Sequence, residues 1–139
     1  MNLSALKEQL RRHEGVVDHA YEDSEGYWTI GVGRLIDQRK GGRLRPDEID
    51  YLLENDLKFL MADLDRALPW WRRMSETRQL VVADMAFNLG IAGLLAFKKA
   101  LAAMQAQDWP TAAAEMKDSR WYAQVGKRAE TLCTMILEG

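Results

Sequence analysis

Two carboxylates and a hydroxyl stand near the start of the chain at a spacing that suits acid–base chemistry. They are Glu14, Asp23 and Thr29, and a run rich in glycine and aromatic residues ends at Gly31. Cleavage of a glycosidic bond needs one carboxylic acid to protonate the leaving oxygen. It also needs a second carboxylate across the sugar, which aims a water molecule or attacks directly. The three residues are therefore candidates for this chemistry.

A short helix is expected to present the first of these residues. Leu3, Leu6 and Leu10 recur at helical spacing, and Gly15 can end the helix with a positive φ. Glu14 then stands at the C-terminal end of that helix. A helix end beside a tight hairpin could hold two acidic groups on opposite sides of a substrate.

A small antiparallel sheet is expected to present the other two. Over residues 16–36, aromatic and β-branched residues alternate with Gly, Ser, Asp and Glu, and residues 23–26 give a strong turn signal. Gly31 and Gly33 allow bends or a close approach of the backbone to other groups. Residues 37–44 are expected to form a polar, basic loop.

The rest of the chain is predicted to be helical. Pro46 suits the first turn of a long helix whose apolar stripe ends before Pro69, and Ser75 and Asp108 are predicted N-caps. A helix, a small sheet, a long helix and a helical remainder indicate an α+β fold in two lobes. The further helices are predicted over residues 70–73, 76–89, 93–106, 109–118 and 126–137.

Length, net charge and cysteine content limit the classes of protein to which the chain can belong. The 139 residues suffice for one domain with its own core, and a net charge of −2 gives no reason to expect nucleic acid as a partner. Cys133 is the sole cysteine, so no internal disulfide forms, and neither histidine has metal-ligand spacing. We expect no metal and no cofactor.

The sequence also predicts neither a signal peptide nor stable membrane insertion. The N-terminus is charged and lacks an apolar core. The longest stretch that looks membrane-like, from Met85 to Phe97, is shorter than the roughly 20 residues of a spanning helix.

Three separated blocks of the chain resemble those of the phage T4-type lysozymes, the muramidases of glycoside hydrolase family 24. In that family a Glu, eight residues, an Asp, five residues and a Thr form the catalytic pattern. The matching blocks are Glu14, Asp23 and Thr29 with Gly33 and Leu35; Phe87 to Gly90 with Gly93 and Phe97; and Ser119 to Tyr122 with Arg128 and Ala129. The resemblance covers almost the whole chain. It implies a single lysozyme domain over residues 1–139. The sheet lobe would span about 14–58, and the helical lobe 1–13 and 59–139.

The resemblance implies a role for each candidate residue. Glu14 would be the general acid that protonates the glycosidic oxygen. Asp23 would be the carboxylate that positions the attacking water, and Thr29 the hydroxyl that holds this water on the opposite face. The family inverts configuration at the anomeric carbon, which requires carboxyl groups about 6.5–9.5 Å apart.

Four further residues are candidates for contacts with the substrate. Leu35 and Phe87 resemble residues that contact the glycan from either lobe. Arg128 resembles an arginine that reaches Glu14 from the helical lobe. Glu25 is a candidate substrate-binding residue that would also brace the turn.

The chain departs from the family pattern at several positions. Two polar residues that contact the glycan in the family align with Ala100 and Glu115 here. The chain stops soon after Ile136, which predicts the loss of a terminal helix. Arg34 replaces a histidine that pairs with an aspartate, and we predict an ion pair between Arg34 and Asp56.

The resemblance implies an endo-acting muramidase that hydrolyses the β-1,4 bond between N-acetylmuramic acid and N-acetylglucosamine in peptidoglycan. Such an endolysin would be a monomer made in the cytoplasm of the host, and it would need a holin lesion to reach the wall. Two alternatives are a lytic transglycosylase, which needs only one Glu and forms an anhydro product, and a non-catalytic glycan-binding protein. Asp23 and Thr29 argue against the first alternative, and the intact Glu14 argues against the second.

Overall fold

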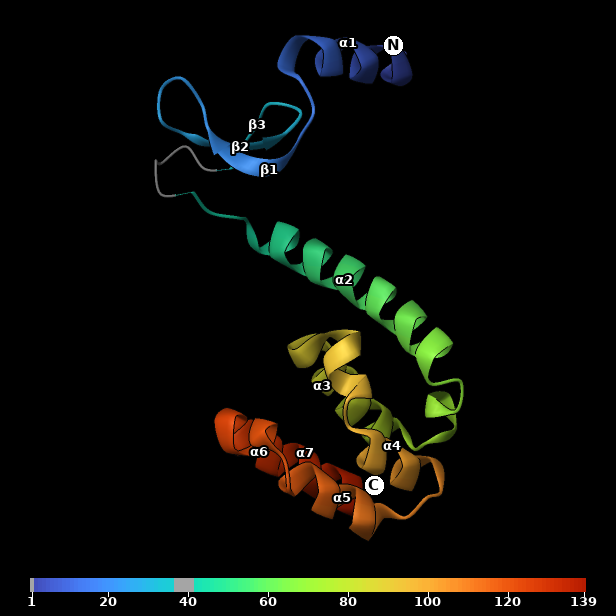
Figure 1. Ribbon diagram of the computed structural model, residues 1–139. Helices are drawn as coiled ribbons and strands as arrows, with labels where there is room; N and C mark the ends of the chain where they lie inside the picture. Colours follow the sequence, from blue (N-terminus) through green and yellow to red (C-terminus); the bar gives the residue numbers. More distant parts are fainter. Residues whose placement is uncertain (1, 37–41) are drawn as a thin grey trace. The chain divides into compact units, whose positions relative to one another are not determined.

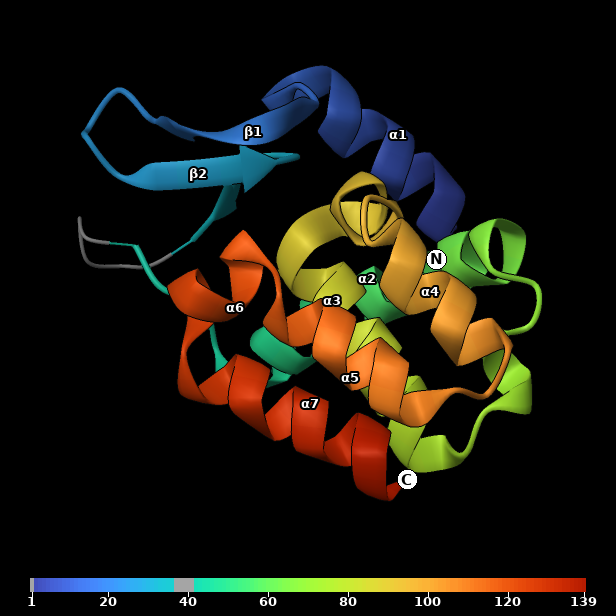
Figure 2. The same cartoon turned by 60° about the horizontal axis from the view of Figure 1, so that its bottom comes forward.

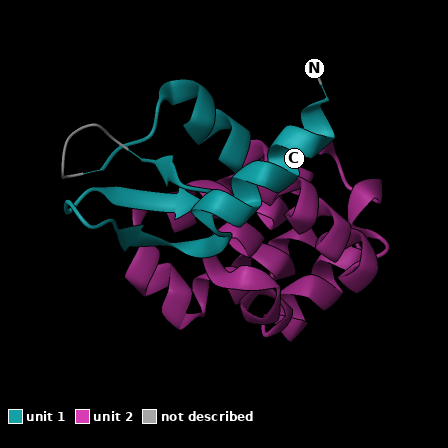
Figure 3. Ribbon diagram, turned by 90° about the horizontal axis from the view of Figure 1, so that it is seen from above, with its two compact units in different colours: residues 1–52 teal, residues 53–139 magenta. Residues whose placement is uncertain are grey.

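The computed structural model describes residues 2–36 and 42–139 (Figure 1). The chain divides into two units, residues 1–52 and residues 53–139, which Figure 3 shows in different colours. Seven helices, a short 3₁₀ helix and a three-stranded antiparallel sheet, counted over the described residues, confirm the predicted α+β class. The predicted division into lobes stays a prediction.

The first unit opens with helix α1 (Leu3–Glu14). Its N-terminus is capped by Asn2, whose side-chain Oδ1 accepts a hydrogen bond from the Ala5 N–H at 3.0 Å. Its C-terminus is closed by Gly15, which has a φ of 78° and donates its N–H to the Arg11 carbonyl. The predicted helix, its end and the terminal position of Glu14 are all confirmed.

The sheet follows directly, in the order β1 (Val17–Glu22), β2 (Trp28–Gly31) and β3 (Arg34–Leu35). The central strand β2 pairs with both neighbours, and Thr29 lies opposite Tyr21 on one side and Leu35 on the other. The register shifts between Val17 and Tyr21, which marks a bulge or irregularity in β1. The predicted small sheet is thus confirmed, whereas most of the predicted basic loop lies outside the described residues.

The long helix α2 (Pro46–Ala67) begins in the first unit and continues into the second. Pro46 is its first residue, and the backbone N–H of Arg45 donates to the side chain of Glu48 at 2.9 Å, which satisfies a donor at the helix start. The predicted start and the end before Pro69 are both confirmed.

The predicted partner of Arg34 was wrong. Arg34 forms an ion pair with Glu48 in the first turn of α2. The predicted partner Asp56 lies eight residues further along the same helix, about 12 Å along its axis at 1.5 Å per residue. The sequence offered several acidic residues on this helix, and the structure pairs Arg34 with Glu48 in its first turn.

Helices make up the second unit, and α5 lies between α4 and α7 in Figure 2, in agreement with the contacts between these helices. Ser75 and Asp108 cap their helices as predicted, each accepting the N–H three residues on. The elements are η1 (Trp71–Arg73), α3 (Glu76–Leu95), α4 (Lys98–Gln105), α5 (Trp109–Lys117), α6 (Arg120–Val125) and α7 (Lys127–Glu138).

The predicted helix end at residue 89 is confirmed, because Gly90 is non-helical (φ 77°, ψ 164°) and two helical segments of α3 meet at a kink there. The predicted helix over residues 93–106 was wrong in one respect. It is interrupted at Ala96 and Phe97, between the end of α3 and the start of α4. Helix α6 was not predicted, because its six residues are too few to display a helical period.

The buried core of the described residues belongs to the second unit. All of its buried hydrophobic side chains lie between Leu64 and Ile136, and both of these residues are fully buried. Helix α3 is long and apolar enough by length and composition to span a membrane. Five of its residues are core residues of this unit. Cys133 on α7 is also buried, and burial raises the pKa of its thiol.

Candidate active site

Glu14 ends α1, and its side chain lies against the backbone of the sheet. A Cβ atom placed on Gly33, in the turn between β2 and β3, would come within 2.5 Å of Glu14 Oε2 and 2.8 Å of its Cδ. The carboxyl group therefore contacts the bare backbone of this glycine. The sequence predicted that Gly33 would allow a close approach of its backbone to another group, and that group is the Glu14 carboxyl.

Asp23 organises the turn between β1 and β2. Its Oδ1 accepts two backbone hydrogen bonds, from the N–H of Glu25 at 2.9 Å and from that of Tyr27 at 2.8 Å. Its own N–H donates to the Tyr27 carbonyl at 2.8 Å, and its carbonyl accepts from Gly26 at 3.1 Å. One carboxylate oxygen is thus committed to the turn, while Oδ2 accepts no hydrogen bond from any described residue.

Thr29 is the one buried polar residue in the described part of the chain, with 6% of its surface exposed. Its hydroxyl donates to the Tyr27 carbonyl at 3.2 Å. Because the proton is used in this way, the lone pairs of Oγ1 are left to accept a hydrogen bond from another group. Asp23 and Thr29 are therefore fixed by the same residue, Tyr27, whose N–H and carbonyl both take part.

Two of the candidate substrate-binding residues lie in the same unit. Leu35 pairs with Thr29 across the sheet and is 41% exposed, so it is an apolar side chain open to a ligand. Glu25 contributes to the turn through its backbone N–H. Its carboxylate takes part in no ion pair with a described residue.

The other two candidates lie in the second unit, on one apolar groove of about 520 Å³. Phe87 is 50% exposed, and Arg128 lies beside it. Sequence reasoning missed the partner of Arg128: its Nε donates to Asp84 Oδ1 at 2.8 Å, and its Nη2 lies 2.7 Å from the same oxygen. No local signal in the sequence pointed to this pair, because 44 residues separate Asp84 from Arg128.

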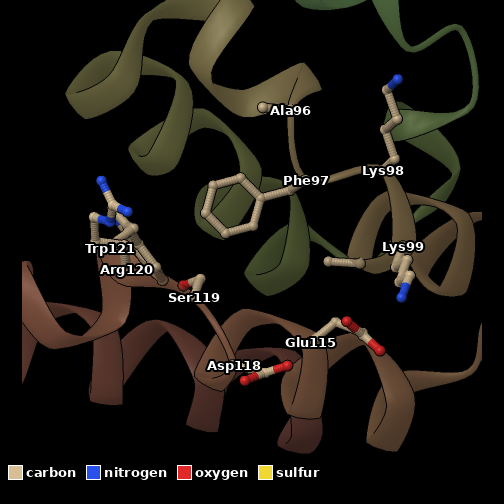
Figure 4. A pocket seen from close by; sticks show the side chains of 10 residues that line it. Ala96, Phe97, Lys98, Lys99, Glu115, Asp118, Ser119, Arg120 and Trp121 are labelled. Atoms are coloured by element: carbon tan, nitrogen blue, oxygen red, sulfur yellow. The ribbon is translucent and has the colours of Figure 1, made fainter.

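A second pocket of about 440 Å³ in this unit contains the two positions where the chain departs from the family pattern. Ala100 is 1% exposed and forms part of its wall without a polar group. In Figure 4 the carboxylates of Glu115 and Asp118 lie on one side, and the ring of Phe97 points toward Trp121. The polar side chains that line this pocket are the hydroxyl of Ser119 and the charged groups around Ala100.

The distant sequence blocks meet under this pocket. Phe97 packs edge-on against Trp121, with ring centroids 5.7 Å apart, and the Trp121 indole N–H donates to Asn88 at 3.1 Å. Ser119 caps α6 by accepting the Tyr122 N–H at 3.2 Å. In these two blocks Phe97, Trp121 and Asn88 take part in packing, and Ser119 caps a helix. Trp121 is a core residue.

No three His, Cys, Asp or Glu side chains gather closely enough to hold a metal ion in residues 2–36 and 42–139. The polar groups of the site in the first unit are the two carboxylates, the hydroxyl and the backbone groups of the turn. As chemical groups, a carboxylic acid can donate a proton, and a carboxylate oxygen and a hydroxyl oxygen can each accept a hydrogen bond from water.

Comparison with known proteins gives a consistent assignment. The family model of the phage lysozymes matches residues 11–134. The pre-baseplate central spike protein Gp5 of Enterobacteria phage T4 is 32% identical over 97% of this chain, and the chain spans only 28% of that protein. Probable T4-type lysozyme 1 of Dictyostelium discoideum is 26% identical, with 99% of this chain and 96% of that protein covered.

A further relative is the peptidoglycan hydrolase gp36 of Pseudomonas phage phiKMV. It is 25% identical over 89% of this chain, which spans 14% of that protein. Because the family model covers most of the chain and includes the three candidate positions, this protein belongs to the phage lysozyme family.

Proposed function

We propose that this protein hydrolyses the β-1,4 bond between N-acetylmuramic acid and N-acetylglucosamine in peptidoglycan, with inversion at the anomeric carbon. Membership of the phage lysozyme family makes the chain a glycoside hydrolase of the lysozyme type. The bond, the stereochemistry and the residue roles are the content of the proposal. The proposal is supported by two hydrogen-bond acceptors, Oδ2 of Asp23 and Oγ1 of Thr29.

In this proposal a water molecule donates one hydrogen bond to Asp23 Oδ2 and one to Thr29 Oγ1. Asp23 Oδ2 is a carboxylate oxygen and so can accept, while Oδ1 is occupied by the turn. Thr29 Oγ1 is left to accept because its proton is donated to the Tyr27 carbonyl. A water molecule that donates both protons has its lone pairs free to attack carbon. As the new bond forms, the carboxylate of Asp23 takes a proton from the water.

Glu14 is the proposed proton donor on the opposite face of the sugar. Its protonated carboxyl group gives its proton to the glycosidic oxygen, which then leaves as the hydroxyl of the departing sugar. The carboxylate of Asp23 also stabilises the positive charge that develops on the sugar ring. Leu35 and Phe87 are proposed to contact the glycan through their exposed apolar surfaces.

Digestion of purified peptidoglycan with Glu14→Gln tests the proposal, with mass spectrometry of the soluble fragments. Glu8→Gln is a matched control, because Glu8 is on the same helix and its exposed carboxylate only pairs with Arg12. We expect reducing muropeptides from the wild type and from Glu8→Gln, and none from Glu14→Gln. NMR of the first product anomer, before mutarotation, tests inversion.

Other outcomes would assign the chain differently. Anhydro-muropeptides would identify a transglycosylase. Wild-type protein that binds peptidoglycan and releases no fragment would identify a glycan-binding module. Full activity in Glu14→Gln would show that another group donates the proton.

We also propose that the enzyme is monomeric and acts in host lysis, accumulating in the host cytoplasm and reaching the wall through a holin lesion. Phage proteins among its relatives support this, and lysis of cells that express the chain only when a holin is co-expressed would test it. Two of those relatives are much longer than this chain. Recovery of the chain as part of a virion would therefore contradict the proposed route. Light scattering would test the monomer.

A further inference from the structure

The contact between Glu14 and Gly33 joins the end of α1 to the turn between β2 and β3. A Cβ on Gly33 would lie 2.5 Å from Glu14 Oε2, 2.8 Å from its Cδ and 3.0 Å from its Cβ. Real Cβ atoms essentially never come within 3.0 Å of such a neighbour. The space that any other residue would fill at position 33 is therefore occupied by the side chain of Glu14.

Comparison with two nearby glycines shows that the need for space at position 33 is distinct from backbone strain. Gly31 and Gly15 also have positive φ values, of 68° and 78°, but a Cβ on either would meet nothing within 4 Å. Gly33 has a φ of 61° as well. All three positions therefore need glycine for their backbone conformation. Position 33 alone among them needs glycine for space, and the group that takes the space is a carboxyl.

We propose that Gly33 is a positioning residue for Glu14, and that its bare backbone is the surface that orients the carboxyl group toward the substrate. This inference rests on the proposed function, in which Glu14 is the proton donor. Among the described residues of the first unit, no salt bridge fixes the direction of the Glu14 carboxylate. A side chain with three rotatable bonds is then oriented by packing, and packing against Gly33 limits the rotamers it can adopt.

The expected loss of activity follows from the overlap between a Cβ atom at position 33 and the Glu14 side chain. With alanine at position 33, Oε2 must retreat by about 0.5 Å to reach the 3.0 Å limit and by about 0.9 Å to reach an ordinary 3.4 Å contact. The carboxyl group is the free end of a flexible side chain and can move, whereas the Glu14 Cβ, at 3.0 Å, must give by only a few tenths of an ångström. The chemistry cannot tolerate the movement of the carboxyl group, because a misplacement of about 1 Å costs roughly 100-fold in rate.

The experiment compares Gly33→Ala with Gly31→Ala, which introduces the same methyl group at the same sign of φ without touching Glu14. We expect both variants to lose several degrees in Tm through backbone strain. We expect kcat on soluble peptidoglycan fragments to fall roughly 10- to 100-fold in Gly33→Ala and to stay near wild type in Gly31→Ala, with KM little changed in either. A crystal structure of Gly33→Ala should show the Glu14 carboxyl displaced.

Equal kcat values in the two variants, or an undisplaced carboxyl in Gly33→Ala, would overturn the inference. If Gly33→Ala does not fold, the double variant Glu14→Ala/Gly33→Ala decides. Recovery of the Tm of Gly31→Ala would identify the Glu14 side chain as the obstacle, and continued unfolding would refute this. The crystal structure and Tm of Gly33→Ala do not depend on activity. They therefore test the positioning of Glu14 even if the proposed function fails, and that failure would be seen separately as full activity in Glu14→Gln.

Discussion

Replacing Thr29 with valine should separate the chemistry of this site from its stability. Valine keeps the shape of threonine and its preference for strands, and it removes only the hydroxyl. The lost hydrogen bond is the one from Oγ1 to the Tyr27 carbonyl, 3.2 Å long. That carbonyl also accepts the Asp23 N–H at 2.8 Å, so it keeps a partner in the variant.

The expected cost in stability is therefore small. A typical hydrogen bond contributes about 1 kcal/mol, and the larger penalty for an unpaired buried acceptor does not apply here. For a chain of this length the loss corresponds to a fall of about 4 °C in Tm. Thermal unfolding followed by circular dichroism would measure it.

The expected cost in activity is much larger. The attacking water would lose one of its two proposed acceptors, and its lone pair would no longer be aimed. A loss of roughly 100-fold in kcat, equivalent to about 2.7 kcal/mol, lies at the lower end of what positioned groups contribute to proton transfer. Release of reducing ends from peptidoglycan would measure kcat, with Thr29→Ser as the control because it keeps the hydroxyl.

The reasoning would be refuted by a folded Thr29→Val protein that retains the wild-type kcat. It would also fail if Thr29→Ser were as inactive as Thr29→Val, because the methyl group and not the hydroxyl would then be the essential part.

Two further predictions concern the helical unit. The hydrogen bond from Arg72, followed by that from Trp71, lowers the pKa of Asp65 below 3.8. A lowered pKa contributes stability above about pH 3.8, and this is lost as the pH falls through the folded-state value. Asp65→Asn should thus lower Tm at about pH 6, and the difference from wild type should shrink by about pH 2.5; a constant difference would contradict the ion-pair account. Gly90→Ala forces a side chain into φ 77°, ψ 164°, and should cost about 1–3 kcal/mol in the free energy of unfolding, measured with urea. An unchanged urea midpoint would show that the kink relaxes without strain.

The parts of the fold that depend on local sequence could be predicted. The period of Leu3, Leu6 and Leu10 gave α1, and the turn residues after Asp23 gave the hairpin. These signals are contained within a few residues, where propensity and capping decide the structure. Glu14 and Asp23 could therefore be assigned to a helix end and a turn before any tertiary contact was known.

The parts of the fold that depend on tertiary contacts could not be predicted from the sequence. Arg34 has a long side chain, and the choice of Glu48 over Asp56 depends on where β3 points it. Asp84 and Arg128 are 44 residues apart, so no local pattern relates them. The helix end at residue 89 was predicted correctly, because Gly90 marks it locally. The break at Ala96 and Phe97 was missed, because neither glycine nor proline stands there.

The burial of Cys133 makes the native protein unreactive toward thiol reagents. Burial raises the pKa of this thiol, so little thiolate exists at neutral pH, and the surrounding core excludes the reagent. It is the sole cysteine of the chain. A cysteine introduced at an exposed position would thus be the one place where a maleimide dye attaches. A pair of dyes, one in each unit, could follow the spacing of the units during turnover without any change to the native thiol.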